Sequence, residues 1–264
     1  MVWFNFHAYI YFIKEKIKYI KNEVRVVSKY IIKINMPPKK REVVILDSCY
    51  NKDNDFCLEI GIDEAGRGPM FGRLYVSAVI VPKDDSFDHS KMKDSKKFTS
   101  EKKIREAADY IKENAIAWTV QYEEADEIDK MNIRQAVLKC MHKCVDDLIS
   151  KMPAANYGHD NYFLLVDGND FKPYMRASNL SFVPYKCVEG GDNKYSAIAA
   201  ASILAKVSRD QYINELCEEH TYLDEHYSLN KNKGYGTKAH LDGIKAHGIS
   251  PWHRKSYGIC KNYS

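Results

Sequence analysis

The sequence predicts an α/β fold in which helices cover both faces of a central sheet. Two short apolar runs, residues 57–62 and 74–81, have the length and composition of strands, and Pro82 closes the second. Beyond residue 100, helical and strand patterns alternate along the chain. A chain of 264 residues with 45% hydrophobic residues is long enough to bury one sizeable core.

The elements after the second strand follow from local patterns. Ser100 can cap a helix over residues 101–114, and the segment 116–122 has the pattern of a strand. Residues 123–151 have the periodicity of one long helix, and the apolar run 162–166 predicts a buried strand. One face of the first helix carries four apolar residues: Ile104, Ala107, Ala108 and Ile111. An alanine-rich segment, residues 193–210, predicts a buried helix that packs tightly because its side chains are small.

Two adjacent carboxylates, Asp63 and Glu64, follow the first strand, and Gly66-Arg67-Gly68-Pro69 comes next. Neighbouring side chains of a regular strand point to opposite faces, so these carboxylates share one site only if the strand ends there, as the glycines indicate. Two carboxylates beside an arginine suggest a metal site that faces an anionic substrate. A turn with surface carboxylates explains the same residues, and this segment alone leaves both interpretations open.

Two further carboxylates, Asp167 and Asp192, also lie next to an end of a predicted element. Asp167 comes at the end of the strand at 162–166 and precedes Gly168, where an ordinary Asp-Gly turn is the simpler interpretation. Asp192 lies near the start of the alanine-rich helix, where unpaired N–H groups and the helix dipole favour a carboxylate. Helix capping explains Asp192 and does not exclude metal binding.

Several blocks in a fixed order carry a resemblance to the type 2 ribonuclease H family, ribonuclease HII. They begin with Asp-Glu-Ala-Gly-Arg-Gly-Pro from Asp63, Val-Asp-Gly around Asp167, and Gly-Asp at Asp192 leading into Ala-Ala-Ser-Ile-Leu-Ala-Lys-Val. The match continues through residues 93–97, 128–133, 233–237 and 253–257, so it covers about three quarters of the chain. Phe98 replaces a common leucine, and Glu189-Gly190 stands where a lysine is common; neither departure removes a group that the reaction needs.

The resemblance implies a ribonuclease H-like fold: a mixed five-stranded sheet flanked by helices, with a smaller helical C-terminal part. We expect a basic N-terminal extension at 1–57, a catalytic domain at 58–210, and a helical region at 211–264 that completes the substrate groove. Residues 1–13 are apolar, but the stretch is shorter than the roughly 20 residues of a spanning helix. We expect residues 1–35 to be dispensable for chemistry, with Met36 as a candidate start; a targeting segment and a basic amphipathic helix stay open.

The resemblance also implies the activity, an endoribonuclease that hydrolyses the RNA strand of RNA–DNA hybrids. It would cut on the 5′ side of single ribonucleotides embedded in duplex DNA and leave 3′-hydroxyl and 5′-phosphate ends. Asp63, Glu64, Asp167 and Asp192 are the implied catalytic metal ligands. Four close carboxylates need a compensating cation, and oxygen ligands favour Mg²⁺ or Mn²⁺. Two ions per site could activate a water and stabilise the leaving oxygen.

Discrimination of RNA from DNA depends on the 2′-hydroxyl. Gly66, Arg67 and Gly68 suit this role because glycines let the backbone approach a sugar closely, and the resemblance assigns the same role to them. Tyr235, between two glycines, resembles the tyrosine that packs on the ribose at the RNA–DNA junction, although spacing alone favours a core or turn tyrosine. We expect contacts with phosphate from two further residues, Lys96 and Asn132.

Charge and cysteine content agree with this function without proving it. The net charge of +4 is too small to indicate nucleic-acid binding by itself. Two basic clusters, around residues 91–105 and 231–255, are solvated faces or tracks for phosphates. Seven cysteines without a Cys-x-x-Cys pattern predict small buried side chains in a reducing intracellular compartment, cytoplasmic or nuclear. His240, His247 and His253 lack metal-ligand spacing and are expected to be surface or structural residues.

The expected partners are RNA–DNA hybrids and ribonucleotide-containing duplex DNA, with no membrane association. We expect a monomer and leave accessory subunits open. A transposase or integrase of the same fold would use a similar acidic centre, but the Gly66–Gly68 segment and Tyr235 argue against it. A non-catalytic accessory subunit would not need all four carboxylates. A nucleotide-binding loop fails because no Gly-Lys-Ser/Thr follows the glycines.

Overall fold

The computed structural model describes residues 11, 13–25, 27, 45–52, 57–152, 161–177 and 179–263. The chain divides into two compact units, Met1–Val43 and Val44–Ser264. In the first unit, residues 13–25 are helical and exposed. Met36 lies outside the described residues, so the expected start there and the dispensability of residues 1–35 stay predictions. Among the residues described, no helix is both long and apolar enough to cross a membrane.

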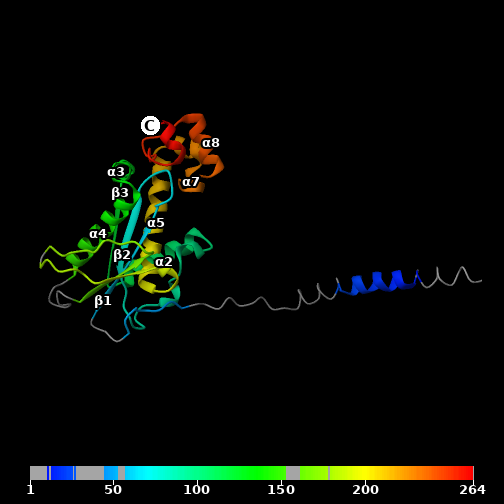
Figure 1. Cartoon of the computed structure of the whole chain (residues 1–264), viewed down its shortest axis with the longest axis horizontal. Coiled ribbons are helices and arrows are strands. Elements are labelled where there is room, and N and C mark those ends of the chain that lie inside the picture. The colour runs from blue at the N-terminus through cyan, green and yellow to red at the C-terminus, as the bar shows by residue number, and fades with distance from the viewer. Residues whose placement is uncertain are drawn as a thin grey trace, which may run out of the picture. The chain divides into compact units, whose positions relative to one another are not determined.

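The second unit is built on a mixed five-stranded sheet, as predicted (Figure 1). Its strands are β1 Leu58–Ala65, β2 Leu74–Ile80, β3 Ala117–Glu123, β4 Tyr162–Asp167 and β5 Tyr185–Val188. Their order across the sheet is β3-β2-β1-β4-β5. The central strand β1 pairs antiparallel with β2 and parallel with β4. This pairing puts the ends of β1 and β4 next to each other at one edge of the sheet.

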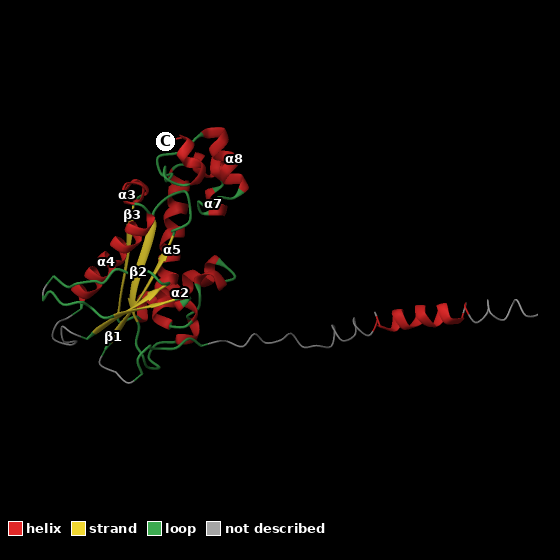
Figure 2. Cartoon of the chain, in the orientation of Figure 1, coloured by secondary structure: helices red, strands yellow, loops and turns green. Residues whose placement is uncertain are grey.

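Helices cover both faces of the sheet (Figure 2). The helices of this unit are α2 Glu101–Asn114, α3 Ala125–Met131, α4 Ile133–Lys151, α5 Ser196–Glu219, α6 Tyr222–Tyr227, α7 Leu229–Asn232 and α8 Lys238–His247. On one face, α4 packs Met141 and Leu148 against Ile60 and Ile62 of β1. On the other, α2 and α5 form a separate core that includes Val79 of β2.

Strand alternation assigns the side chains of β1 to these two cores. Ile60 and Ile62 face α4, so Gly61 faces α5. A Cβ atom added at Gly61 would lie only 2.1 Å from the backbone carbon of Ala197. The backbones of β1 and α5 therefore approach each other so closely that only glycine fits at this position, two residues before Asp63.

The smaller helical C-terminal part is confirmed. Its helices α6, α7 and α8 pack on the second half of α5 and form a third core, with Phe71, Leu223, Tyr227 and Ile244 buried in it. The predicted division into residues 1–57, 58–210 and 211–264 stays a prediction; α5 runs without interruption through residue 210.

Local patterns predicted most elements well. The helix α2 has the predicted bounds, and the Ser100 hydroxyl caps it by accepting the Lys103 N–H at 3.3 Å. The single helix expected at 123–151 is wrong, because Asn132 has a positive φ of 70° and separates α3 from α4. The Asn132 side chain accepts the N–H of Gln135 at 3.1 Å and so begins α4.

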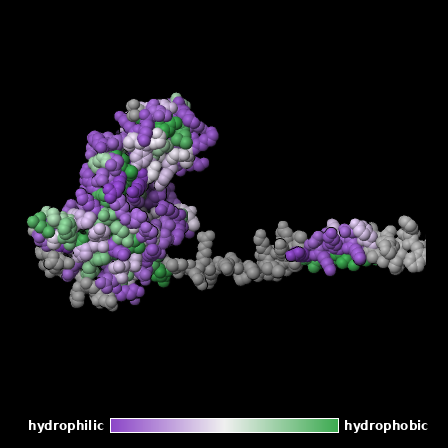
Figure 3. All heavy atoms as spheres, viewed as in Figure 1, coloured by the Kyte–Doolittle hydropathy of each residue, from purple (hydrophilic) through white to green (hydrophobic). Residues whose placement is uncertain are grey.

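The cysteines of the described chain are all free, and Cys140, Cys144, Cys217 and Cys260 are buried, as expected for small core residues. A hydrophobic area lies on the surface over the connection between β4 and β5 (Figure 3). Met175, Leu180 and Phe182 are exposed in this connection.

Candidate active site

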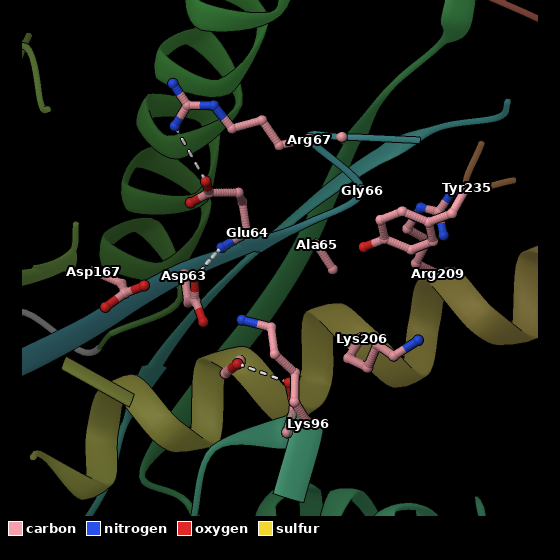
Figure 4. Close-up of a pocket in the computed structure, with 13 residues that line it drawn as sticks. Asp63, Glu64, Ala65, Gly66, Arg67, Lys96, Asp167, Lys206, Arg209 and Tyr235 are labelled. Atoms are coloured by element: carbon pink, nitrogen blue, oxygen red, sulfur yellow. Dashed lines mark hydrogen bonds and ion pairs between the residues drawn. The ribbon is translucent and has the colours of Figure 1, made fainter. Parts of the chain in front are cut away.

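Asp63 and Glu64 lie within β1, which continues to Ala65 and pairs Asp63 with Ser77 and Glu64 with Val76. The expectation that the strand ends at Asp63 is therefore wrong, because pairing with β2 extends it. The two carboxylates keep the alternation of the strand (Figure 4): Asp63 points to the side of α5, and Glu64 points toward Arg67. They do not lie side by side.

Asp167 joins them because β4 ends beside β1. The pairing of β1 with β4 stops at Ile62 and Val166, one residue before each acidic position. A cavity opens at this end of the sheet. Its described lining consists of Asp63, Glu64, Ala65, Gly66, Arg67, Gly68, Ser95, Lys96, Asp167, Ser202, Lys206, Arg209 and Tyr235. Eight of the ten site residues expected from the sequence line it; Asp192 and Asn132 are the exceptions.

Burial and mutual repulsion disfavour charge on the carboxylates. Asp63 is 6% exposed, and burial followed by the charges of Glu64 and Asp167 raises its pKa well above the usual range. Burial also raises the pKa of Glu64, against the opposing effect of Arg67. For Asp192, burial and then the charges of Asp94 and Asp167 raise the pKa. Asp167 is thus the shared neighbour whose charge acts on each of the other three carboxylates.

Each carboxylate also has a hydrogen-bond partner in the protein. Asp63 accepts the N–H of Glu64 at 2.7 Å, and Asp167 accepts the N–H of Gly191 at 2.7 Å. Glu64 lies 3.4 Å from the Arg67 guanidinium. Asp192 lies in a 3₁₀ turn, Gly191–Asn193, and accepts the side-chain N–H of Asn193 at 2.9 Å. It therefore does not cap α5, whose first turn begins after Tyr195.

The donor set fits divalent cations. It contains only carboxylate oxygens, which hard ions such as Mg²⁺ and Mn²⁺ prefer, and its raised pKa values indicate a place where positive charge would be stabilising. Among the described residues, no three His, Cys, Asp or Glu side chains are already grouped as metal ligands. The partners explain this, since Glu64 is turned to Arg67 and Asp192 to Asn193.

The cavity is also lined by the Gly66–Gly68 loop, which follows β1, and by Tyr235, which lies across the cavity from Asp167 (Figure 4). Gly66 has a φ of 95°, and a Cβ atom there would lie 2.3 Å from Nε of Arg209. Tyr235 is 50% exposed, so it is not a core tyrosine. Its ring would lie 3.7 Å from a Cβ atom added at Gly68. A flat apolar ring and a backbone without side chains therefore face the same space.

Lys96 reaches the cavity from a 3₁₀ turn, Ser95–Lys97, that begins at Asp94. The carboxylate of Asp94 accepts the N–H of Lys96 at 2.9 Å, and the Lys96 charge lowers the pKa of Asp192 against the effect of burial. Asn132 lies elsewhere, at the start of α4, and its side-chain oxygen serves as a helix cap. The structure does not bring it into the cavity.

Three cavity residues on α5 were not predicted as site residues: Ser202, Lys206 and Arg209. Their spacing of four and three residues places them on one helix face, which is the signal that could have found them. Arg209 lies inside α5, which continues to Glu219, beyond the end of the helix predicted over residues 193–210. Its guanidinium donates to the carbonyl oxygens of Phe71 at 3.1 Å and Arg73 at 3.3 Å.

Comparisons with known proteins match most of the chain to one family. The family model described as Ribonuclease HII matches residues 60–260. Ribonuclease HII of Bacteroides thetaiotaomicron is 43% identical over 209 residues, which cover 79% of this chain and 92% of that protein.

Two solved structures have a similar fold. Ribonuclease H2 from Pyrococcus horikoshii OT3 gives a TM-score of 0.61 at 20% identity, over 78% of this chain and 96% of that chain. Bst-RNase HIII in complex with Mn²⁺ gives a TM-score of 0.52 at 18% identity, over 81% of this chain and 69% of that chain.

Proposed function

Because the chain belongs to the ribonuclease HII family, and is therefore a metal-dependent endonuclease for the RNA of RNA–DNA hybrids, we propose that it also cuts beside single ribonucleotides in duplex DNA. The cut would be on the 5′ side of the ribonucleotide. The observation that carries this proposal is the exposed ring of Tyr235 beside Gly68, across the cavity from Asp167 (Figure 4).

Asp63, Glu64, Asp167 and Asp192 would hold two divalent ions, Mg²⁺ or Mn²⁺. When bound, such ions supply an activated water and stabilisation of the leaving oxygen, which gives 3′-hydroxyl and 5′-phosphate ends. The carboxylates contribute a buried acidic centre in which ionisation is disfavoured without a cation. Arg67 would keep Glu64 oriented in the absence of substrate.

The Gly66–Gly68 loop and Tyr235 would recognise the sugar. A 2′-hydroxyl both donates and accepts a hydrogen bond, so the backbone of Gly66–Gly68 offers matching groups where no side chain intervenes. The half-exposed ring of Tyr235 offers an apolar surface on which a ribose can pack. One ribonucleotide would then be enough to orient the scissile phosphate.

Phosphates on either side would meet basic groups. Lys96 lies in the cavity, and Lys206 lines it from α5, where it pairs with Asp210 at 2.6 Å. We keep Asn132 as a proposed phosphate contact, which would have to come from its Nδ2 group because its oxygen caps α4. Contacts of this kind would weaken binding as salt concentration rises.

The test is cleavage of a DNA duplex with one embedded ribonucleotide by the purified chain alone. Reactions with Mg²⁺, with Mn²⁺ and with chelator would be compared with an Asp63→Asn variant. We expect one cut 5′ of the ribonucleotide, lost in chelator and in the variant. Cleavage of long hybrids only would refute the reading of single ribonucleotides. Activity that requires added protein would refute the proposed monomeric function.

A further inference from the structure

Two buried histidines support the side of the cavity that carries Tyr235. His240 lies in the first turn of α8, and His253 lies in the turn that follows α8. Their side chains are 0% and 1% exposed, and their Nε2 atoms are 3.0 Å apart. The rings are packed between Phe71 and Tyr227, which both contact His253 edge on.

The neighbours of the pair determine where its protons lie. The N–H of Ser250 donates to Nδ1 of His253 at 2.9 Å, so the proton of His253 is on Nε2. Nδ1 of His240 lies 3.0 Å from the carbonyl oxygen of Tyr235, which only accepts, so the proton of His240 is on Nδ1. The result is a chain of two hydrogen bonds. Nε2 of His253 donates to Nε2 of His240, and Nδ1 of His240 donates to the carbonyl oxygen of Tyr235.

The residue next to His253, Arg254, forms hydrogen bonds with the backbone in and beside the Gly66–Gly68 loop. Arg254 is 0% exposed, and its guanidinium donates to the carbonyl oxygens of Pro69 at 2.9 Å, Gly72 at 2.9 Å and Arg67 at 3.3 Å. The backbone adds a direct link, because the N–H of Met70 donates to the carbonyl oxygen of Gly234 at 2.9 Å.

We propose that His240, His253 and Arg254 are positioning residues that fix the distance between Tyr235 and the Gly66–Gly68 loop, and so set the preference for a single embedded ribonucleotide over a long hybrid. This inference rests on the proposed function above. None of the three lines the described cavity, so their substitution removes no side chain from its lining.

The two substrates would depend to different extents on these three positioning residues, which we call the brace. A single ribonucleotide offers one 2′-hydroxyl in one register, so its recognition needs the ring and the loop at the correct spacing. A long hybrid offers a 2′-hydroxyl at every RNA position, and many registers can become productive. A looser brace would therefore weaken cleavage of the first substrate more than that of the second.

The test compares His240→Leu with His240→Asn. Leucine cannot bond to the Tyr235 carbonyl, whereas the Nδ2 group of asparagine lies at the corresponding distance from the backbone and can donate to it. Both variants would be assayed well below their melting temperatures. For His240→Leu we expect kcat/KM to fall about 10–100-fold more on the single ribonucleotide than on the hybrid, since a shift near 1 Å costs about 100-fold. His240→Asn should keep the wild-type ratio within about threefold.

A second measurement does not depend on activity. Imidazole ¹⁵N spectra of the wild-type protein at neutral pH should show His253 with its proton on Nε2 and His240 with its proton on Nδ1. Other tautomers, or charged rings, would overturn the inference. So would equal losses of His240→Leu on both substrates, or an asparagine variant no better than leucine, while the wild type cuts both. A wild type that cuts hybrids but no single ribonucleotide would overturn the proposed function first, and this inference with it.

Discussion

Gly61 is the point where an added methyl group tests how tightly the acidic strand is held. In Gly61→Ala the Cβ atom would lie 2.1 Å from the backbone carbon and 2.3 Å from the carbonyl oxygen of Ala197. Ordinary van der Waals contact begins at 3.4 Å, so β1 and α5 must separate by about 1.3 Å (3.4 minus 2.1). Neither partner is a flexible side chain that could move aside.

Two effects should follow. Overpacking of a core costs about 1–3 kcal/mol of the free energy of unfolding, and a backbone clash belongs at the upper end. Asp63 lies two residues from Gly61, while Ser202 and Lys206 line the cavity from α5. A shift of about 1 Å between these groups should lower kcat about 100-fold.

Gly243→Ala is the matched control. Its Cβ atom would lie 2.0 Å from the carbonyl oxygen of His226, an equal clash between α6 and α8, away from the carboxylates. Urea midpoints and single-turnover cleavage of a hybrid would be measured for both variants at a temperature where each is folded. We expect both midpoints to fall, and kcat on the hybrid to fall much further in Gly61→Ala than in Gly243→Ala. An unchanged midpoint for Gly61→Ala, or equal losses of kcat, would refute the reasoning.

Three further outcomes follow from the electrostatics of the described residues. Asp63→Asn should abolish cleavage yet raise the urea midpoint of the metal-free protein at pH 7. The pKa of Asp63 is raised in the folded protein, so this carboxyl group favours folding only at low pH, and the gain in the variant should vanish below about pH 4. A lower midpoint of the variant at pH 7 would contradict this prediction. Burial lowers the pKa of His253 to about 3, so its contribution is present above about pH 6.5 and is lost on acidification; between pH 7 and 5 the wild type should lose about 2 kcal/mol more of unfolding free energy than His253→Gln, as measured by urea titration. Equal losses would argue against a buried neutral ring. Arg67→Ala should raise the pKa of Glu64 further and move the acidic limb of the kcat/KM profile to higher pH, and an unmoved limb would mean that the Arg67–Glu64 pair has no influence on activity.

Sequence patterns predicted those parts of the fold that depend on local chemistry. The helix α2 could be predicted closely because Ser100 caps its start and the periodic apolar positions lie within it. The break at Asn132 could not, since a positive φ in a residue other than glycine leaves no mark on periodicity. The extension of β1 through Ala65 depends on pairing with β2, which is a tertiary contact.

The candidate site shows the same division. Motifs indicated Asp63, Asp167 and Tyr235, which the fold does place around one cavity. Motifs did not predict the ion pair between Arg67 and Glu64. The contact between His240 and His253 could not be predicted from the sequence either, because the two residues are 13 positions apart and are brought together by a turn.

The bond between Arg254 and Pro69 joins residues 185 positions apart. Contacts of such long range form late, because closing a large loop of unfolded chain is entropically unfavourable. During synthesis the strand with Asp63 would leave the ribosome long before its partner Arg254 exists. A nascent chain therefore carries the acidic residues without the pocket that aims them at a sugar. Competence to cut nucleic acid would arise in one late step, when nearly the whole catalytic unit has been made.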